Sequence, residues 1–101
     1  MNIKKILTES IKNRSKIKII YKQEPKNRTV YPHVLYTNTK EHLILDAYQV
    51  EGYSSSHSIF PMWKMFLVQD ISDIEVLEDT FTPITSYNAE SIRYKNSIEK
   101  I

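Results

Sequence analysis

The spacing of hydrophobic positions changes after the first fourteen residues of the chain. In residues 3–14 the apolar side chains recur every third or fourth position, and most of the positions between them are charged or polar. This period is typical of a helix with one face toward a core, and Asn2 is a suitable N-cap residue. The pattern therefore predicts an N-terminal helix whose buried stripe is Ile3, Ile6, Leu7 and Ile11.

From Lys16 onward, apolar and polar residues alternate in short runs, and residues typical of turns lie between these runs. Alternation with a period of two predicts half-buried β-strands. Pro32 cannot donate to a ladder, so the second of these strands is either at a sheet edge or bulged near its middle. The pattern predicts five strands, at residues 16–22, 28–37, 42–50, 63–69 and 73–79.

Two stretches do not fit the strand pattern. Residues 51–61 contain the only glycine, Gly52, and four serines, which predicts an exposed loop long enough to carry function. Residues 82–101 begin with a proline-containing turn and have sparse apolar positions, which predicts a C-terminal extension with a short helix. We therefore divide the chain into a domain, residues 1–81, and an extension, residues 82–101.

One helix followed by five short strands predicts a mainly β fold of the α+β class, a small antiparallel barrel. Closure suits so short a chain because it removes exposed strand edges. The core residues expected from the alternation are Ile6, Ile17, Ile19, Leu45, Phe66 and Val76.

Composition narrows the class of protein. The 101 residues suffice for one domain, and 41% hydrophobic with 26% charged residues is ordinary for a globular chain. Cysteine is absent, which excludes disulfides and thiolate metal ligands and favours a reducing compartment. No apolar run reaches eighteen residues, and the N-terminus lacks the apolar stretch of a signal peptide. We expect a soluble cytoplasmic protein that does not enter a membrane.

The net charge of +2 conceals an uneven distribution. Residues 1–28 hold nine of the fourteen lysines and arginines, whereas residues 66–81 hold five acids and no base. Such asymmetry can orient an anionic ligand or a partner. Two solvated faces of opposite sign are the alternative interpretation.

The residues that catalysis requires do not occur in suitable patterns. Three histidines lie on separate predicted elements, and none has the spacing of a zinc motif. The serines lack a G-x-S-x-G elbow, and one glycine cannot form a glycine-rich phosphate loop. We therefore expect no enzyme activity, no metal and no cofactor.

Aromatic and basic residues are interleaved along the predicted strands. Rings that stack on bases, together with cations that contact phosphates, are typical of proteins that bind single-stranded nucleic acid. The preference of tyrosine for strands is the alternative explanation. The candidate ligand-binding residues are Arg28, Tyr31, His33, Tyr48 and Lys64.

The order of several segments resembles the WYL domain, a module common in bacterial regulatory proteins. Arg28, Val30 and Pro32 match an arginine followed by a hydrophobic-X-Pro, and residues 63–81 resemble the aromatic-basic-X-Phe strand and the closing strand. The triplet that names the family is Leu-Ile-Leu at residues 43–45, and Leu67 and Asp70 stand where the family places two arginines. The resemblance covers residues 3–81.

This resemblance implies a Sm-like, SH3-type barrel that senses a ligand, often a nucleic acid or a nucleotide-derived molecule. Such domains usually accompany a DNA-binding helix-turn-helix, for which the remaining residues leave no room, so a stand-alone regulator acting through a partner protein is expected. Arg28 and Lys64 are the matching cations. The alternative is a protein-interaction or oligomerisation module that has lost the ligand site, as Leu67 and Asp70 favour. We also expect a homodimer.

Overall fold

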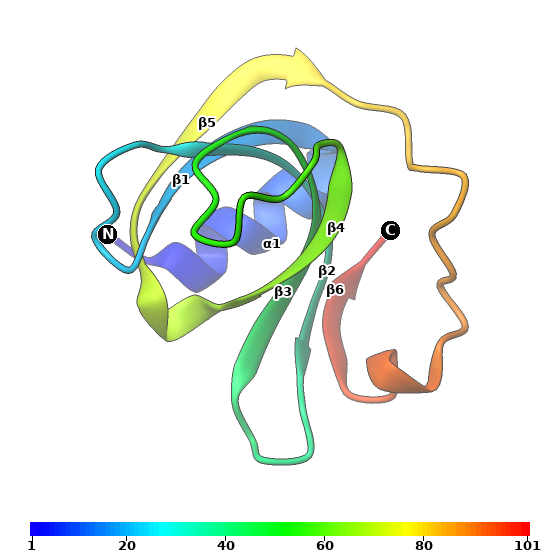
Figure 1. The fold of residues 1–101 in the computed structure, drawn as a ribbon. Helices are drawn as coiled ribbons and strands as arrows, with labels where there is room; N and C mark the ends of the chain where they lie inside the picture. Colours follow the sequence, from blue (N-terminus) through cyan, green and yellow to red (C-terminus); the bar gives the residue numbers. More distant parts are fainter.

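Helix α1 (Ile3–Asn13) begins the fold in the computed structural model, which describes residues 1–101 (Figure 1). The Asn2 side chain accepts a hydrogen bond from the Lys5 backbone N–H at 3.1 Å, which satisfies one of the free donors of the first turn. Arg14 ends the helix in a left-handed conformation with φ 53°, and its N–H donates to the Ile11 carbonyl. The predicted N-terminal helix is confirmed, ending one residue earlier.

The strands form one antiparallel sheet. Five of them have the order β4-β3-β2-β1-β5, and β6 pairs with the end of β2. A short 3-10 turn, η1 (Val68–Asp70), joins β4 to β5, and another, η2 (Ile92–Tyr94), precedes β6. The strand bounds are β1 Ser15–Tyr21, β2 Arg28–Thr37, β3 Leu43–Gly52, β4 Met62–Leu67, β5 Ile71–Thr80 and β6 Ser97–Lys100.

The sheet does not close. Strands β4 and β5 stand at opposite ends of the strand order and do not pair with each other. The mainly β, α+β class is confirmed, whereas the closed barrel is not. Strand β2 is central, but Pro32 lies between the residues that pair with β1 and those that pair with β6, so one side of it is a local edge. The register of β2 against β3 also shifts between Pro32 and Val34, as a bulge requires.

The C-terminal helix predicted for residues 82–101 is wrong. This part of the chain, which we call the C-terminal segment, contains η2 and strand β6 (Figure 1). Strand β1 pairs with β2 only as far as Val30, so the later residues of β2 have a free side. Strand β6 takes this side by pairing with Val34, Leu35 and Tyr36, which satisfies backbone groups that would otherwise be unpaired.

Each face of the sheet has its own core. On the inner face, α1 covers a cluster that includes Ile17, Ile19, Leu45 and Phe66, four predicted core residues that are buried. Ile6 packs against this cluster and is partly buried. The prediction for Val76 is wrong, since 48% of it is exposed. Strand β5 is outermost, and only the residues in its first half, Ile71 and Ile74, reach the core.

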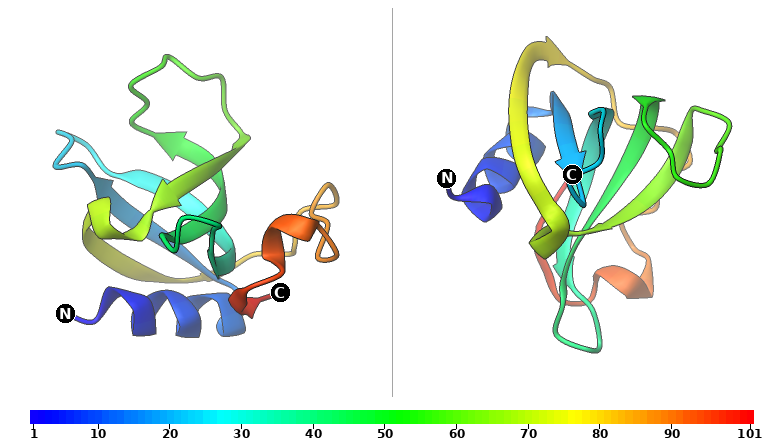
Figure 2. Two further views of the ribbon diagram at one scale, coloured as in Figure 1. Left: turned by 90° about the horizontal axis from the view of Figure 1, so that it is seen from below. Right: turned by 60° about the vertical axis from the view of Figure 1, so that its left-hand side comes forward.

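The outer face of the sheet carries a second, smaller core. Val34, Tyr36 and Ile44 pack there with Tyr94 from the C-terminal segment. Figure 2 shows α1 and the turn that contains η2 on different sides of the strands. The sheet is therefore covered by α1 on its inner face and by the C-terminal segment on part of its outer face. None of the helices is both long enough and apolar enough to cross a membrane.

Candidate ligand-binding groove

The structure divides the five predicted ligand-binding residues between the two faces of the sheet. Residues directly opposite each other in an antiparallel pair point to the same face. Arg28 pairs with the core residue Ile19, and Lys64 pairs with the core residue Ala47, so both cations belong to the inner face. Tyr31 pairs with Tyr48, the neighbour of Ala47 on β3, and these tyrosines lie on the outer face with His33.

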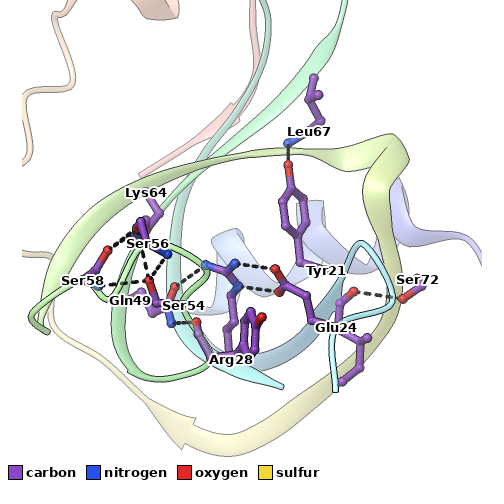
Figure 3. Close-up of polar contacts among 12 residues, drawn as sticks. Tyr21, Glu24, Arg28, Gln49, Ser54, Ser56, Ser58, Lys64, Leu67 and Ser72 are labelled. Carbon is purple, nitrogen blue, oxygen red and sulfur yellow. Dashed lines mark hydrogen bonds and ion pairs between the residues drawn. The ribbon is translucent and has the colours of Figure 1, made fainter. Parts of the chain in front are cut away.

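Arg28 is buried and its charge is already neutralised. Its Nε and Nη2 donate to the two carboxylate oxygens of Glu24 at 3.0 and 2.9 Å, and Nη1 donates to Gln49 Oε1 at 3.1 Å (Figure 3). The guanidinium also lies 5.4 Å from the centre of the Phe66 ring. Only 4% of Arg28 is exposed, so this residue is part of the folded core in this structure and not a free cation for a ligand.

Lys64 lies beside this ion pair. Its Nζ donates to Ser58 Oγ at 2.7 Å, and Ser58 is linked to Ser56 and Ser54 in the loop between β3 and β4 (Figure 3). Partial burial, and then the positive charge of Arg28, lower the pKa of the Lys64 ammonium. The two predicted cations are thus brought together, but only Lys64 is without a carboxylate partner.

His33 is fully buried and has a structural environment. Its Nε2 accepts a hydrogen bond from the Ile84 backbone N–H at 3.2 Å, which leaves Nδ1 as the donor to the Tyr31 carbonyl at 2.8 Å. Burial lowers the pKa of the His33 imidazole. The neutral ring therefore joins β2 to the C-terminal segment. Nearby, the Tyr31 ring stacks on Phe81 with the ring centres 4.9 Å apart.

A hollow of about 510 Å³ lies on the outer face, between β4 and the C-terminal segment. We call it the outer groove. Trp63 lines it from β4 and Tyr87 from the C-terminal segment, with their ring centres 6.3 Å apart. Trp63 Nε1 donates to Ser86 Oγ at 2.9 Å, and the Tyr87 hydroxyl donates to the Ile101 carbonyl, also at 2.9 Å. The volume of the outer groove is within the range of about 300–1,000 Å³ that is usual for small-molecule sites.

Asp46 is a buried carboxylate at the base of the outer groove. It accepts hydrogen bonds from the hydroxyls of Tyr36 at 3.1 Å and Tyr94 at 2.7 Å, and from Arg93 Nη2. Burial raises the pKa of the Asp46 carboxyl, and these donors oppose that shift. The nearby Tyr36 hydroxyl, and then the charge of Asp46, raise the pKa of the Arg93 guanidinium, while burial opposes that rise. The cluster fastens the C-terminal segment to β2 and β3.

None of the five candidate residues predicted from sequence lies in the C-terminal segment, which supplies Tyr87, Arg93 and Tyr94 to the outer groove. Asp46 could have been recognised as a buried acid from sequence, because it is the only acid within the apolar run of residues 43–48. Buried acids require partners, so such a position predicts a basic or hydroxyl residue nearby. Arg93 and the adjacent Tyr94 supply those groups, but their distance along the chain concealed the pairing.

The outer groove offers aromatic surfaces, hydroxyls and the Arg93 guanidinium, and Asp46 and Lys64 also line it. The structure contains no group of three or more histidine or acidic side chains that could hold a metal ion. The aromatic side chains of the outer groove can stack on a flat ring of a ligand, and its hydroxyl groups can exchange hydrogen bonds with the edges of that ring. No protein-family model matches this chain, and no curated protein or solved structure matches it.

Proposed function

We propose that this protein is a non-catalytic regulatory module that binds a nucleotide or a short single-stranded nucleic acid in the outer groove and acts through a partner protein. The observation that carries the proposal is the pair of aromatic rings, Trp63 and Tyr87, that face a hollow of about 510 Å³ from two different elements. Stacking of a base on an aromatic side chain contributes about 1–3 kcal/mol and tolerates any base.

The remaining lining of the outer groove suits the same ligand. Ser86, Asn88 and Ser91 supply hydroxyl and amide groups that can bond to the edge of a base. Arg93 supplies a guanidinium that is paired with Asp46 on one side and, at 51% exposure, is open to a ligand on the other. This site replaces the one expected from sequence, because Arg28 is committed to Glu24 and points to the other face.

We also propose that the fold is related to a Sm-type barrel and to the WYL domain. This relation is supported by one helix followed by five consecutive antiparallel strands, with a bulge in β2. The open side between β4 and β5 departs from a closed barrel. Membership of the WYL family stays a prediction.

The only tryptophan of the chain reports on the proposed site. Titration with a single-stranded DNA octamer at low salt should change the emission of Trp63 and saturate in the micromolar range. Tyr87→Ala should weaken binding by roughly ten-fold, because one stacking surface is lost. Tyr53→Ala is the matched control, since Tyr53 lies beside Arg28 and should leave the affinity unchanged. Unchanged emission at millimolar DNA would rule out the proposal.

Self-association is a second candidate function. Several large apolar side chains are exposed, among them Ile59 at 89%, Ile92 at 87% and Met65 at 62%. Strands β4 and β5 also present unpaired edges, which can pair with another chain. A homodimer should appear in light scattering at high micromolar concentration, and Met65→Lys should dissociate it. A strict monomer at that concentration would refute this candidate.

A further inference from the structure

A second hollow adjoins the outer groove. Its volume is about 640 Å³, and it lies between the β2–β3 hairpin and the C-terminal segment. Met65 and Arg93 line both hollows, so the two spaces meet at these side chains. Ile44 and Ile92 provide an apolar wall in the second hollow. The two hollows therefore lie side by side, with Met65 and Arg93 at their junction, and we call the pair of hollows the track.

Arg93 is held in a fixed position at this junction. Its Nη2 donates to the buried Asp46 carboxylate, and its guanidinium lies 5.6 Å from the centre of the Tyr94 ring. The Arg93 side chain is 51% exposed, whereas that of Asp46 is 3% exposed. The positive end of the pair therefore faces solvent and the negative end faces the protein. Asp46 is the only carboxylate paired with Arg93, so the exposed side of the guanidinium can still donate to a ligand.

We propose that the two hollows hold successive nucleosides of a single strand and that Arg93 binds the phosphate that joins them. The inference rests on the proposed function and specifies its ligand. One base stacks at Trp63 and Tyr87, and the next nucleoside lies against Ile44 and Ile92. Guanidinium donors suit phosphate oxygens, and a guanidinium fixed by Asp46 loses little freedom on binding.

The arrangement of chemistry along the track favours nucleic acid over a peptide. A strand of nucleic acid alternates rings and anions, one charge per nucleotide, and the track places a cation between two ring-sized spaces. The second hollow also carries Asn38 and Asn96, whose amides can donate and accept at base edges. An uncharged extended peptide would offer no anion to the exposed side of the Arg93 guanidinium, whose other side is paired with Asp46.

A comparison of two ligands tests the inference in the unaltered protein. The first is a dinucleoside with a single phosphodiester, and the second is the same molecule with a neutral methylphosphonate linkage. We expect the charged ligand to bind about ten-fold more tightly, as a charge-assisted hydrogen bond would produce. Its log affinity should fall with log salt with a slope of about 0.7, the value for one neutralised phosphate on a single strand.

Variants then locate the phosphate contact. Arg93→Met keeps the aliphatic stem and should remove both the preference for the charged ligand and the salt slope. Lys40→Met is the matched control, because it removes one positive charge from the nearby hairpin, at an exposed residue that lines neither hollow. This control should keep the preference. Circular dichroism of Arg93→Met checks that its fold is intact.

The outcomes separate this inference from the function on which it rests. Equal binding of the two ligands by the unaltered protein, or a preference that survives Arg93→Met, would overturn the role of Arg93 while the stacking site stands. Binding of the dinucleoside no tighter than a single nucleoside would overturn the two-nucleoside track. If no nucleoside, dinucleoside or oligonucleotide changes the Trp63 emission, the proposed function fails together with the inference.

Discussion

Removal of the Arg28 guanidinium should destabilise the fold strongly. The side chains of Arg28 and Glu24 are 5% and 11% exposed, and they meet through two hydrogen bonds. Breaking a buried pair by removing one partner costs about 3–5 kcal/mol, because the remaining charge has no counterion. We expect Arg28→Met to lower the free energy of unfolding by about this amount. Because small domains have total stabilities of about 5–15 kcal/mol, the loss should be easy to measure.

Urea unfolding at pH 7 provides the assay, and a second substitution identifies the cause. Arg28→Met combined with Glu24→Gln removes both charges, and it should recover most of the lost stability because neither charge is left buried alone. Lys26→Met is the matched control, since Lys26 is exposed in the same turn and should change stability by less than about 0.5 kcal/mol. A cost below about 1 kcal/mol for Arg28→Met would contradict the buried pair. Arg28 would then again be a candidate ligand cation.

Three further predictions follow from the fold. His33 has a lowered pKa, so below pH 6.5 the unfolded chain takes up a proton that the folded chain does not. As the pH is lowered below 6.5, the free energy of unfolding should therefore fall by up to about 1.4 kcal/mol per pH unit until the pKa of the folded state is reached. Urea unfolding measured from pH 7 to pH 5 should show this slope in the unaltered protein and not in His33→Gln. Gly52 has φ +107°, and an added Cβ would lie 2.4 Å from the Asn27 carbonyl oxygen, so Gly52→Ala should cost more than about 1 kcal/mol by the same assay. Phe66→Ala should cost about 3–5 kcal/mol in urea, because Phe66 is almost fully buried in the inner core, and a cost near zero would show that the register of β4 is wrong.

The elements with a clear hydrophobic period were predictable from sequence. The stripe from Ile3 to Ile11 and the alternation around Ile17 and Ile19 each specify one buried face, so a helix and strands follow from local pattern. Strand β6 was not predictable in this way. The sequence Ser-Ile-Glu-Lys has a single apolar residue, and its pairing depends on the unoccupied side of β2, which is a tertiary feature.

The candidate site was predictable only in part, because its geometry depends on register. Tyr48, which was expected to bind ligand, lies on the outer face and contacts Trp63, but it does not line the outer groove. Adjacent side chains on a strand point opposite ways, so the Lys64 ammonium reaches Ser58 while Trp63 faces outward, although Lys64 also contributes to the lining of the outer groove. The contribution of Arg93 depends on a contact with Asp46 across 47 residues, for which the periodicity of a single sequence carries no information.

The indole N–H of Trp63 provides the most direct test of the proposed function. As the only tryptophan, it gives a single indole resonance in a ¹⁵N-labelled sample, and it lies in the outer groove, hydrogen-bonded to Ser86. On addition of the dinucleoside phosphate, we expect this resonance and the amides of Tyr87 and Arg93 to shift together. Shifts confined to Ser58 and Arg28, with the Trp63 resonance unmoved, would place the ligand on the inner face and contradict the account.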